Sequence, residues 1–315
     1  MMADALDDGD DIIFVYMGGD QRVPRHVRRA RIHKSVKIVR ARAFQNCRRL
    51  ISVEFHDGVE IIEQYAFWGC YSLKGAIKLL GVKIIEHAAF QFCRLLTDVE
   101  FGDQLETIEQ SAFNSTALKN IKLPSVRTVG RTAFGNCGEL SDVEFGEELR
   151  TIQQSAFHSC PKLKRIVLPL KGNIIEDHVL GWCPKLSTVD LVGGIQNTVA
   201  SLHMESWRSE MTGEISRINQ VLPTIPREKT EAIQQWMDSV IRRLNHYKDE
   251  NHRLLKEATT LLELALWKTN LADSEEGERK GVKTVEEMES SRDEIRYTSG
   301  ADIVIKNVLP FLALK

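Results

Sequence analysis

Cysteine is the residue type whose spacing most suggests chemistry in this chain. The cysteines recur at a nearly constant interval, at Cys47, Cys70, Cys93, Cys137, Cys160 and Cys183. Thiolates bind zinc, but a zinc site needs its ligands in a tetrahedral arrangement. A row of thiols at one repeating position gives no such arrangement, and no histidine accompanies the cysteines at ligand spacing. Because free cysteine is among the most buried residue types, the pattern favours core packing over a metal or redox site.

Catalytic signatures are missing from the sequence. It contains no Walker loop, no dinucleotide-binding glycine pattern, no nucleophile elbow and no His-Glu-x-x-His pair. The candidate bases His87 and His158 fall at repeating positions that hold residues such as Gln64 and Gln110 elsewhere. An active site is not periodic, so the sequence predicts a protein that is not an enzyme, with no cofactor and no metal site.

The elements that position these residues are short and repeated. An Ala-Phe pair recurs at intervals of 23 residues, once 21, and a cysteine, or Thr116 in the shortened copy, follows each phenylalanine. A seventh, degenerate copy keeps Cys183 and Leu186. One copy cannot bury both of its apolar faces, so the copies must stack. The six pairs are Ala43-Phe44, Ala66-Phe67, Ala89-Phe90, Ala112-Phe113, Ala133-Phe134 and Ala156-Phe157.

Each copy predicts two short strands and a turn. Residues 50–55 and 59–62 alternate apolar and polar side chains, as half-buried strands require. Gly58 stands near the turn between them. The stretch from Glu63 to Phe67 is too short for an independent helix and suits one helical turn.

This repeat resembles a known family. The pattern Leu-x-x-Val-x-Phe, then an Ile-Ile-Glu strand, then Tyr-Ala-Phe-x-Gly-Cys at a 23-residue step is similar to the BspA-type leucine-rich repeats, over about residues 26 to 192. The resemblance implies an α/β repeat solenoid of short parallel strands with helical turns. The family includes surface adhesins and intracellular proteins, so the resemblance alone implies no particular partner.

Charged residues alternate in sign from copy to copy at the outward positions of both predicted strands. In parallel strands that are in register, opposite charges would face one another and fix that register. We call each set of residues that occupies one repeat position a column. The two charged columns are Glu54, Lys78, Glu100, Lys122 and Glu144, and Glu60, Lys83, Glu106, Arg127 and Arg150.

A neighbouring column lacks this alternation and is therefore the better candidate for contact with a partner. We call it the candidate contact column. Its members are Ser52, Ala76, Asp98, Asn120, Asp142, Arg165 and Thr188.

A basic stretch is the alternative site. Residues 21–53 carry nine Arg and two Lys with no acid, whereas residues 1–20 carry six Asp and no base. The stretch 22–49 could bind an anionic ligand or nucleic acid, but it lacks interleaved aromatic residues, and the acidic segment can neutralise it. The sequence therefore favours a protein partner over nucleic acid.

The apolar period changes from two to three or four after Leu191, which predicts an α-helical C-terminal module. We expect one helix over 195–222 and a longer one over about 227–269, the latter with a heptad seam through 233–265. An asparagine within such a seam can set oligomer choice. The seam could pair with a second copy through residues 230–266 or fold back on its own chain, and both remain open. The candidate oligomerisation residues are Val240, Leu244, Asn251 and Leu254.

These patterns predict five segments: an acidic segment 1–25, a solenoid 26–194, a helical hairpin or coiled-coil module 195–270, a mobile charged linker 271–298 and an apolar end 299–315. The start lacks the basic and apolar regions of a secretory signal, and no stretch is long enough to span a membrane. We therefore expect an intracellular, probably cytoplasmic, scaffold for protein–protein interaction that binds through the solenoid face and the helices. A surface adhesin, which would need export, is the rival hypothesis.

Overall fold

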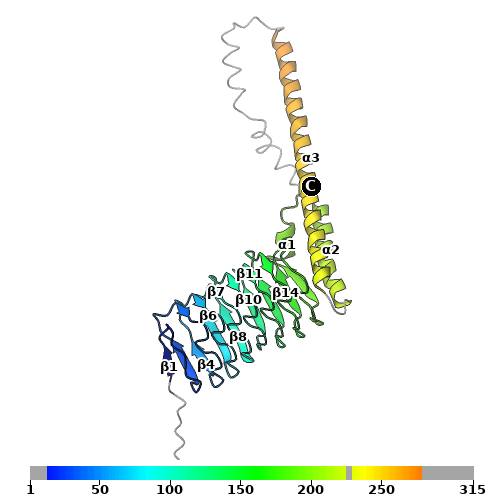
Figure 1. Cartoon of the computed structure of the whole chain (residues 1–315). Helices are drawn as coiled ribbons and strands as arrows, with labels where there is room; N and C mark the ends of the chain where they lie inside the picture. The colour runs from blue at the N-terminus through cyan, green and yellow to red at the C-terminus, as the bar shows by residue number, and fades with distance from the viewer. Residues whose placement is uncertain (1–12, 225–228, 279–315) are drawn as a thin grey trace, which may run out of the picture. The chain divides into compact units, whose positions relative to one another are not determined.

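The computed structural model describes residues 13–224 and 229–278 (Figure 1). Among these residues, those up to Val199 and those from Glu210 to Ile241 form one compact unit. The second unit consists of Ala200–Ser209 and the described residues from Arg242 onward.

The first unit is a stack of coils, each with a long strand, a short strand and a turn side. The long strands form three parallel sheets, in the orders β1-β2-β4, β6-β8 and β10-β12-β14-β15. They are β1 (Ile13–Tyr16), β2 (Arg29–Ile32), β4 (Ser52–Glu54), β6 (Lys74–Leu79), β8 (Leu95–Phe101), β10 (Asn120–Leu123), β12 (Asp142–Phe145), β14 (Arg165–Leu168) and β15 (Thr188–Leu191).

The short strands form one six-stranded parallel sheet in the order β13-β11-β9-β7-β5-β3. They are β3 (Ile38–Val39), β5 (Ile61–Ile62), β7 (Ile84–Ile85), β9 (Thr107–Ile108), β11 (Thr128–Val129) and β13 (Thr151–Ile152). Isoleucine and valine occupy the buried position of each pair, where β-branched side chains pack well on a pleated surface. The parallel repeat solenoid expected from the sequence is confirmed.

The turn side, formed by residues 40–49 and their equivalents in later copies, is the third side of each coil. It is a run of tight turns, where we expected one helical turn. Two residues per copy adopt left-handed backbone angles, for example Arg42 and Asn46, each with φ 60°. Phe44 donates its N–H to the carbonyl of Ala66 at 2.8 Å, and each later phenylalanine repeats this bond to the next coil. Backbone hydrogen bonds therefore join neighbouring coils on all three sides.

Stacked phenylalanine rings fill the core along the solenoid. Phe44, Phe67, Phe90, Phe113, Phe134 and Phe157 are all fully buried. Ring centroids of successive copies lie 4.6 to 5.4 Å apart, and from Phe67 onward the planes differ by no more than 6°. Offset-stacked rings at this spacing attract one another in addition to burying apolar area.

The glutamates that follow the short strands connect one coil to the coil before it. Glu86 accepts the backbone N–H of Gln64 at 3.0 Å, and Glu109 accepts that of His87 at 3.0 Å. Glu63 accepts the N–H of Ala41 at 2.8 Å in the same way. Each carboxylate thus satisfies an amide of the preceding turn side, which the strand ladders leave unpaired.

The solenoid starts ahead of residue 26. Strand β1 lies within the segment that we expected to be only acidic, and it pairs in register with β2. Tyr16 is fully buried, its ring lies 5.3 Å from Phe44, and its hydroxyl accepts the N–H of Arg40. The apolar residues 13–16 therefore supply an additional long strand and the first aromatic ring of the stack. Residues 1–12 lie outside the described residues.

The C-terminal helices differ in their limits from the expected ones. They are α1 (Gly194–Val199), α2 (Glu205–Val221), the short 3₁₀ helix η2 (Leu222–Thr224) and α3 (Thr230–Glu278). The helix expected over 195–222 is broken at 200–204, where Leu202 is buried and its carbonyl accepts the guanidinium Nε of Arg208 at 2.6 Å. Helix α3 runs beyond residue 269, and residues 279–298 and 299–315 lie outside the described residues.

Side chains of α2 and the start of α3 complete the last coil within the first unit. Asn219 accepts the N–H of Val189 at 2.8 Å and donates to its carbonyl at 3.2 Å, as a further strand would. The fully buried Lys229 donates to the carbonyls of Pro184 and Leu186, and burial lowers its pKa. Thr230 accepts the N–H of Leu180. Polar side chains thus satisfy an end of the array that no next copy covers.

We predict that Phe90→Ala lowers the free energy of unfolding by about 3 to 5 kcal/mol, because it empties one position of the ring stack. Urea denaturation followed by circular dichroism measures this. The control is Leu95→Ala, since that leucine is 51% exposed and its truncation leaves no cavity. Equal stability of the two variants would contradict a core that depends on the stack.

Candidate interaction surface

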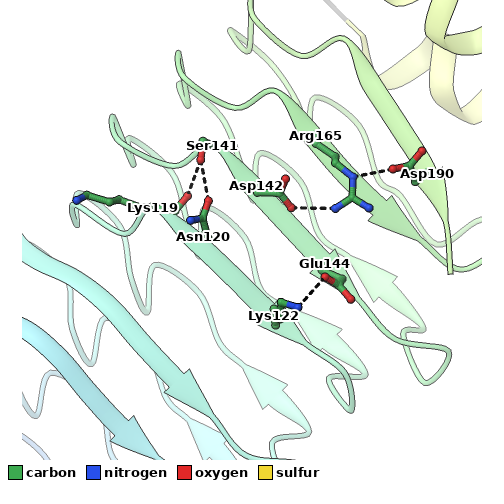
Figure 2. A network of polar contacts seen from close by, with 8 residues as sticks. All are labelled: Lys119, Asn120, Lys122, Ser141, Asp142, Glu144, Arg165 and Asp190. Carbon is green, nitrogen blue, oxygen red and sulfur yellow. Dashed lines mark hydrogen bonds and ion pairs between the residues drawn. The ribbon is translucent and has the colours of Figure 1, made fainter. Parts of the chain in front are cut away.

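The candidate contact column lies on the long strands. In the sheet formed by β10, β12, β14 and β15, Asn120, Asp142, Arg165 and Thr188 are consecutive Cα partners. Figure 2 shows this part of the column, with side chains of successive strands pointing toward one another. The structure therefore brings four of the seven predicted residues into one continuous row.

Arginine 165 is the centre of a polar network in this row (Figure 2). Its Nη1 donates to Asp142 Oδ1 at 3.2 Å and its Nε donates to Asp190 Oδ2 at 2.6 Å. The hydrogen bond to Asp190 raises the pKa of Arg165. Ser141 donates to Asn120 Oδ1 at 2.8 Å. Each side chain of the Arg165 ion pairs remains 36% to 39% exposed, so the network is fixed in place and still reachable.

The other three members lie in different sheets. Ala76 and Asp98 are Cα partners between β6 and β8, and Ser52 is the partner of Arg29 between β4 and β2. A register shift between Gly75 and Ala76 accompanies the change of sheet. The column is therefore continuous only within each sheet, a division that the regular spacing of the copies did not reveal.

The charged columns form the expected pairs between coils. Lys78 and Lys122 contact Glu100 and Glu144 at 3.0 and 3.3 Å on the long strands. On the short-strand side Glu60 lies 2.9 Å from Lys83 and 3.3 Å from Lys37. Because these side chains are exposed, each pair adds little stability, and its main effect is on register.

The cysteines pack inside the coils as predicted, and all six are free thiols. Each also has a role that the sequence did not reveal: Cys70, for example, donates its S–H to the carbonyl of Phe44 in the coil before it, at 3.1 Å. The same bond joins Cys93 to Phe67 and Cys183 to Phe157. Among the residues that the structure describes, no group of three or more His, Cys, Asp or Glu could hold a metal ion.

The basic stretch does have aromatic neighbours, contrary to our expectation. Arg42 lies over the ring of Tyr65 and Arg48 over the ring of Tyr71, at 5.6 and 5.4 Å from the ring centroids. The rings come from the next copy, 23 residues later, so no scan of the stretch itself could find them. Reading the column that contains Arg48, Tyr71 and Arg94 would have done so.

The predicted oligomerisation residues fall into buried and accessible pairs. Val240 is fully buried and Leu244 is 6% exposed in the single chain. Asn251 lines a cavity of about 240 Å³ with Trp207 and Tyr247, whose rings stack at 5.0 Å within the second unit. Leu254 is 41% exposed, as are Leu261 at 68% and Leu264 at 56%. The seam is accessible only in its later part.

The architecture is that of a leucine-rich-repeat solenoid, and the sequence comparisons assign the family. Residues 26–137 and 83–203 match the family described as BspA type Leucine rich repeat region, in six copies. Together these ranges exceed half of the chain, so the protein belongs to this family. Proteins with these repeats generally act as protein-interaction scaffolds or surface adhesins and are typically non-enzymatic. No helix in the part of the chain that the structure describes is long and apolar enough to cross a membrane.

Solved structures of bacterial leucine-rich repeat proteins are similar to parts of the chain. One from Bacteroides ovatus is 26% identical over 58% of this chain and 46% of its own, with a TM-score of 0.48. One from T. pallidum is 28% identical over 44% and 68%, with a TM-score of 0.42. The chain thus spans about half the length of the Bacteroides protein (46%). No curated protein matches it.

We predict that stability contributed by the thiols is lost at high pH. Burial raises the pKa of Cys137 from 9.0 to about 11. A thiol with a raised folded pKa stabilises the fold fully below its unfolded value, and this contribution disappears as pH rises from about 9 to about 11. The free-energy cost of Cys137→Ala, measured by urea denaturation, should therefore shrink across that window. A cost that does not change with pH would contradict a buried, hydrogen-bonded thiol.

Proposed function

We propose that this protein is a non-catalytic scaffold that binds a protein partner through the long-strand face of β10, β12, β14 and β15. The Arg165 network is the observation that carries the proposal. Charged groups that are held by neighbours and still partly exposed can form further hydrogen bonds without losing side-chain freedom on binding. Arginine in such a place is also typical of interface centres.

The shape of this face supports a macromolecular partner over a small ligand. Small ligands bind in concave sites that bury most of their surface. The two best-defined cavities, of about 250 and 240 Å³, are lined by residues 171–175 with 234–238 and by residues 201–207 with 247–255. Neither includes a residue of the candidate contact column. An extended row of polar groups across several coils suits a protein surface.

The later part of α3 supports a second contact, with another copy of the chain. Leu254 and Leu261 belong to the heptad seam and are exposed in the single chain. Pairing of two such seams would cover them, as a coiled coil does. We place the protein in a reducing, intracellular compartment, because a solenoid with six free cysteines is compatible with such an environment.

We predict that Thr188→Arg abolishes partner capture. The new side chain would stand in the row beside Arg165 and add like charge and bulk to the face. Tagged protein is used to capture partners from cell extract, and the captured proteins are quantified by mass spectrometry. Thr128→Arg is the matched control, because Thr128 is also half-buried but lies on the short-strand side. If both variants capture the same partners in the same amounts, this face is not the binding surface.

We predict that Leu261→Asp dissociates an assembly of copies without unfolding the solenoid. Sedimentation velocity over a range of protein concentrations measures the assembly, and circular dichroism checks the fold. Thr260→Asp is the control, since Thr260 is exposed and about 100° away from Leu261 around the helix. A wild-type protein that stays monomeric throughout would eliminate the seam as an oligomerisation site.

A further inference from the structure

A second surface lies on the turn side of the early coils, separate from the long-strand face. We call Arg42, Arg48, Tyr65, Tyr71, Phe92 and Arg94 the arginine–aromatic surface. Arg94 lies 5.7 Å from the ring centroid of Tyr71 and 5.9 Å from that of Phe92. Together with Arg48 it places two guanidinium groups on the ring of Tyr71. Cation–π contacts of this kind hold arginine side chains against the protein surface.

The rings are themselves fixed by their neighbours. Tyr65 has its hydroxyl 2.9 Å from His87 Nε2, within hydrogen-bond distance. Trp68 donates its indole N–H to Gln91 at 3.1 Å and packs edge-on against Phe92 at 5.8 Å. All of these rings are half-buried, whereas the three arginines are exposed. The surface is therefore a rigid base that carries exposed guanidinium groups.

The fold does not require these residue types. Turn-side positions equivalent to Arg48, Tyr71 and Arg94 hold Ala117 and Gly138 in the following copies. The position equivalent to Phe92 holds Ser115, Asn136 and Ser159. These small residues allow the same coil-to-coil bonds, for example from Asn136 N–H to the carbonyl of His158 at 2.8 Å. Arginine and aromatic residues on the early coils thus need a reason other than stacking of the coils.

Backbone strain points in the same direction. Arg42, Tyr65 and Phe92 have φ angles of 60°, 59° and 65°, in the left-handed region. This region suits glycine and asparagine and disfavours bulky side chains. Large residues persist there only where the surrounding structure holds them, and such positions are enriched at functional sites.

The charge on this surface is not neutralised by the chain around it. Arg42, Arg48 and Arg94 form no ion pair with any of the residues that the structure describes, although the nearby Arg40 pairs with Glu63 at 2.9 Å. Guanidinium groups that lie on rings keep their N–H edges free for acceptors, and those edges match the two oxygens of a carboxylate.

We propose that the arginine–aromatic surface binds an acidic peptide segment of a partner protein, with its carboxylates on Arg42, Arg48 and Arg94. Bases of single-stranded nucleic acid bind by stacking on open ring faces. Here guanidinium groups lie over the rings of Tyr65, Tyr71 and Phe92, so the arrangement favours carboxylates over bases. The three coils span roughly 10 Å at the strand spacing, which an extended peptide of a few residues covers.

The test measures binding of a fluorescein-labelled peptide of alternating Glu and Gly, about ten residues long, by fluorescence anisotropy with the full chain. We expect binding that weakens with added salt. The double variant Arg48→Ala, Arg94→Ala should weaken it at least about tenfold, since two charge-assisted hydrogen-bonding groups are lost. Arg131→Ala is the matched control: Arg131 is exposed on the turn side of a later coil and should leave affinity unchanged.

Further variants separate the geometry from the charge alone. The double variant Arg48→Lys, Arg94→Lys keeps both charges but loses the planar fork, so affinity should still fall. Equal binding by the lysine variant and wild type, or an equal loss in Arg131→Ala, would overturn the proposal. Tighter binding of an oligothymidylate probe than of the peptide, lost in the same alanine variant, would replace it with a nucleic-acid surface.

One arm examines the chain's own acidic segment as the occupant. Replacement of Asp4, Asp7, Asp8, Asp10 and Asp11 by Asn removes the charge of that segment while the full chain is retained. Peptide binding to both wild type and this variant supports a partner as the source of the carboxylates. Binding only to the Asn variant would show that the chain covers its own surface, and would overturn the assignment to a partner.

Discussion

Each coil of this protein can close its core only against its neighbours, and the stacked phenylalanines are where that constraint is met. A ring such as Phe90 is fully buried because Phe67 lies 5.0 Å away on one side and Phe113 5.1 Å away on the other. The thiol of Cys93 then binds the carbonyl of Phe67, and Glu109 binds the amide of His87, so core, turn and strand are all tied to the same register. A shift of one coil relative to the next would break every one of these contacts together.

The same dependence makes the two ends of the stack special. Tyr16 takes the place of a phenylalanine at the start, and its hydroxyl satisfies an amide that a preceding coil would otherwise reach. At the other end Asn219 imitates a strand with its amide group, while Lys229 supplies N–H donors to two carbonyls. Both ends use polar side chains with enough hydrogen-bonding groups to replace a missing copy, which is how a repeat array ends without an open sheet edge.

Sequence periodicity was sufficient to predict the coils, the buried phenylalanines and cysteines, and the pairing of charges such as Lys78 with Glu100. It could not predict the break at 200–204, because the fixing of Leu202 by Arg208 is a tertiary contact within an otherwise helical pattern. Nor did it show that the candidate contact column divides among three sheets, since local register shifts leave the repeat spacing unchanged. The thiol acceptors and the partners of the arginines were missed because they lie one coil away, where only a column-by-column reading would reveal them.

That one-coil relation also explains how the early coils can carry so much positive charge. In a stacked solenoid, residues of one column lie about 5 Å from their counterparts, so arginines in adjacent copies would repel one another. Along the column of Arg48 the intervening residue is Tyr71, which separates it from Arg94 by two coils, or about 10 Å, close to the Debye length at 0.1 M salt. The ring attracts both guanidinium groups while it keeps them apart. In the charged columns the same problem is solved by alternation of sign, which leaves those columns neutral. Alternation with an aromatic ring instead leaves the charge in place, on a rigid base, and available to an acidic partner.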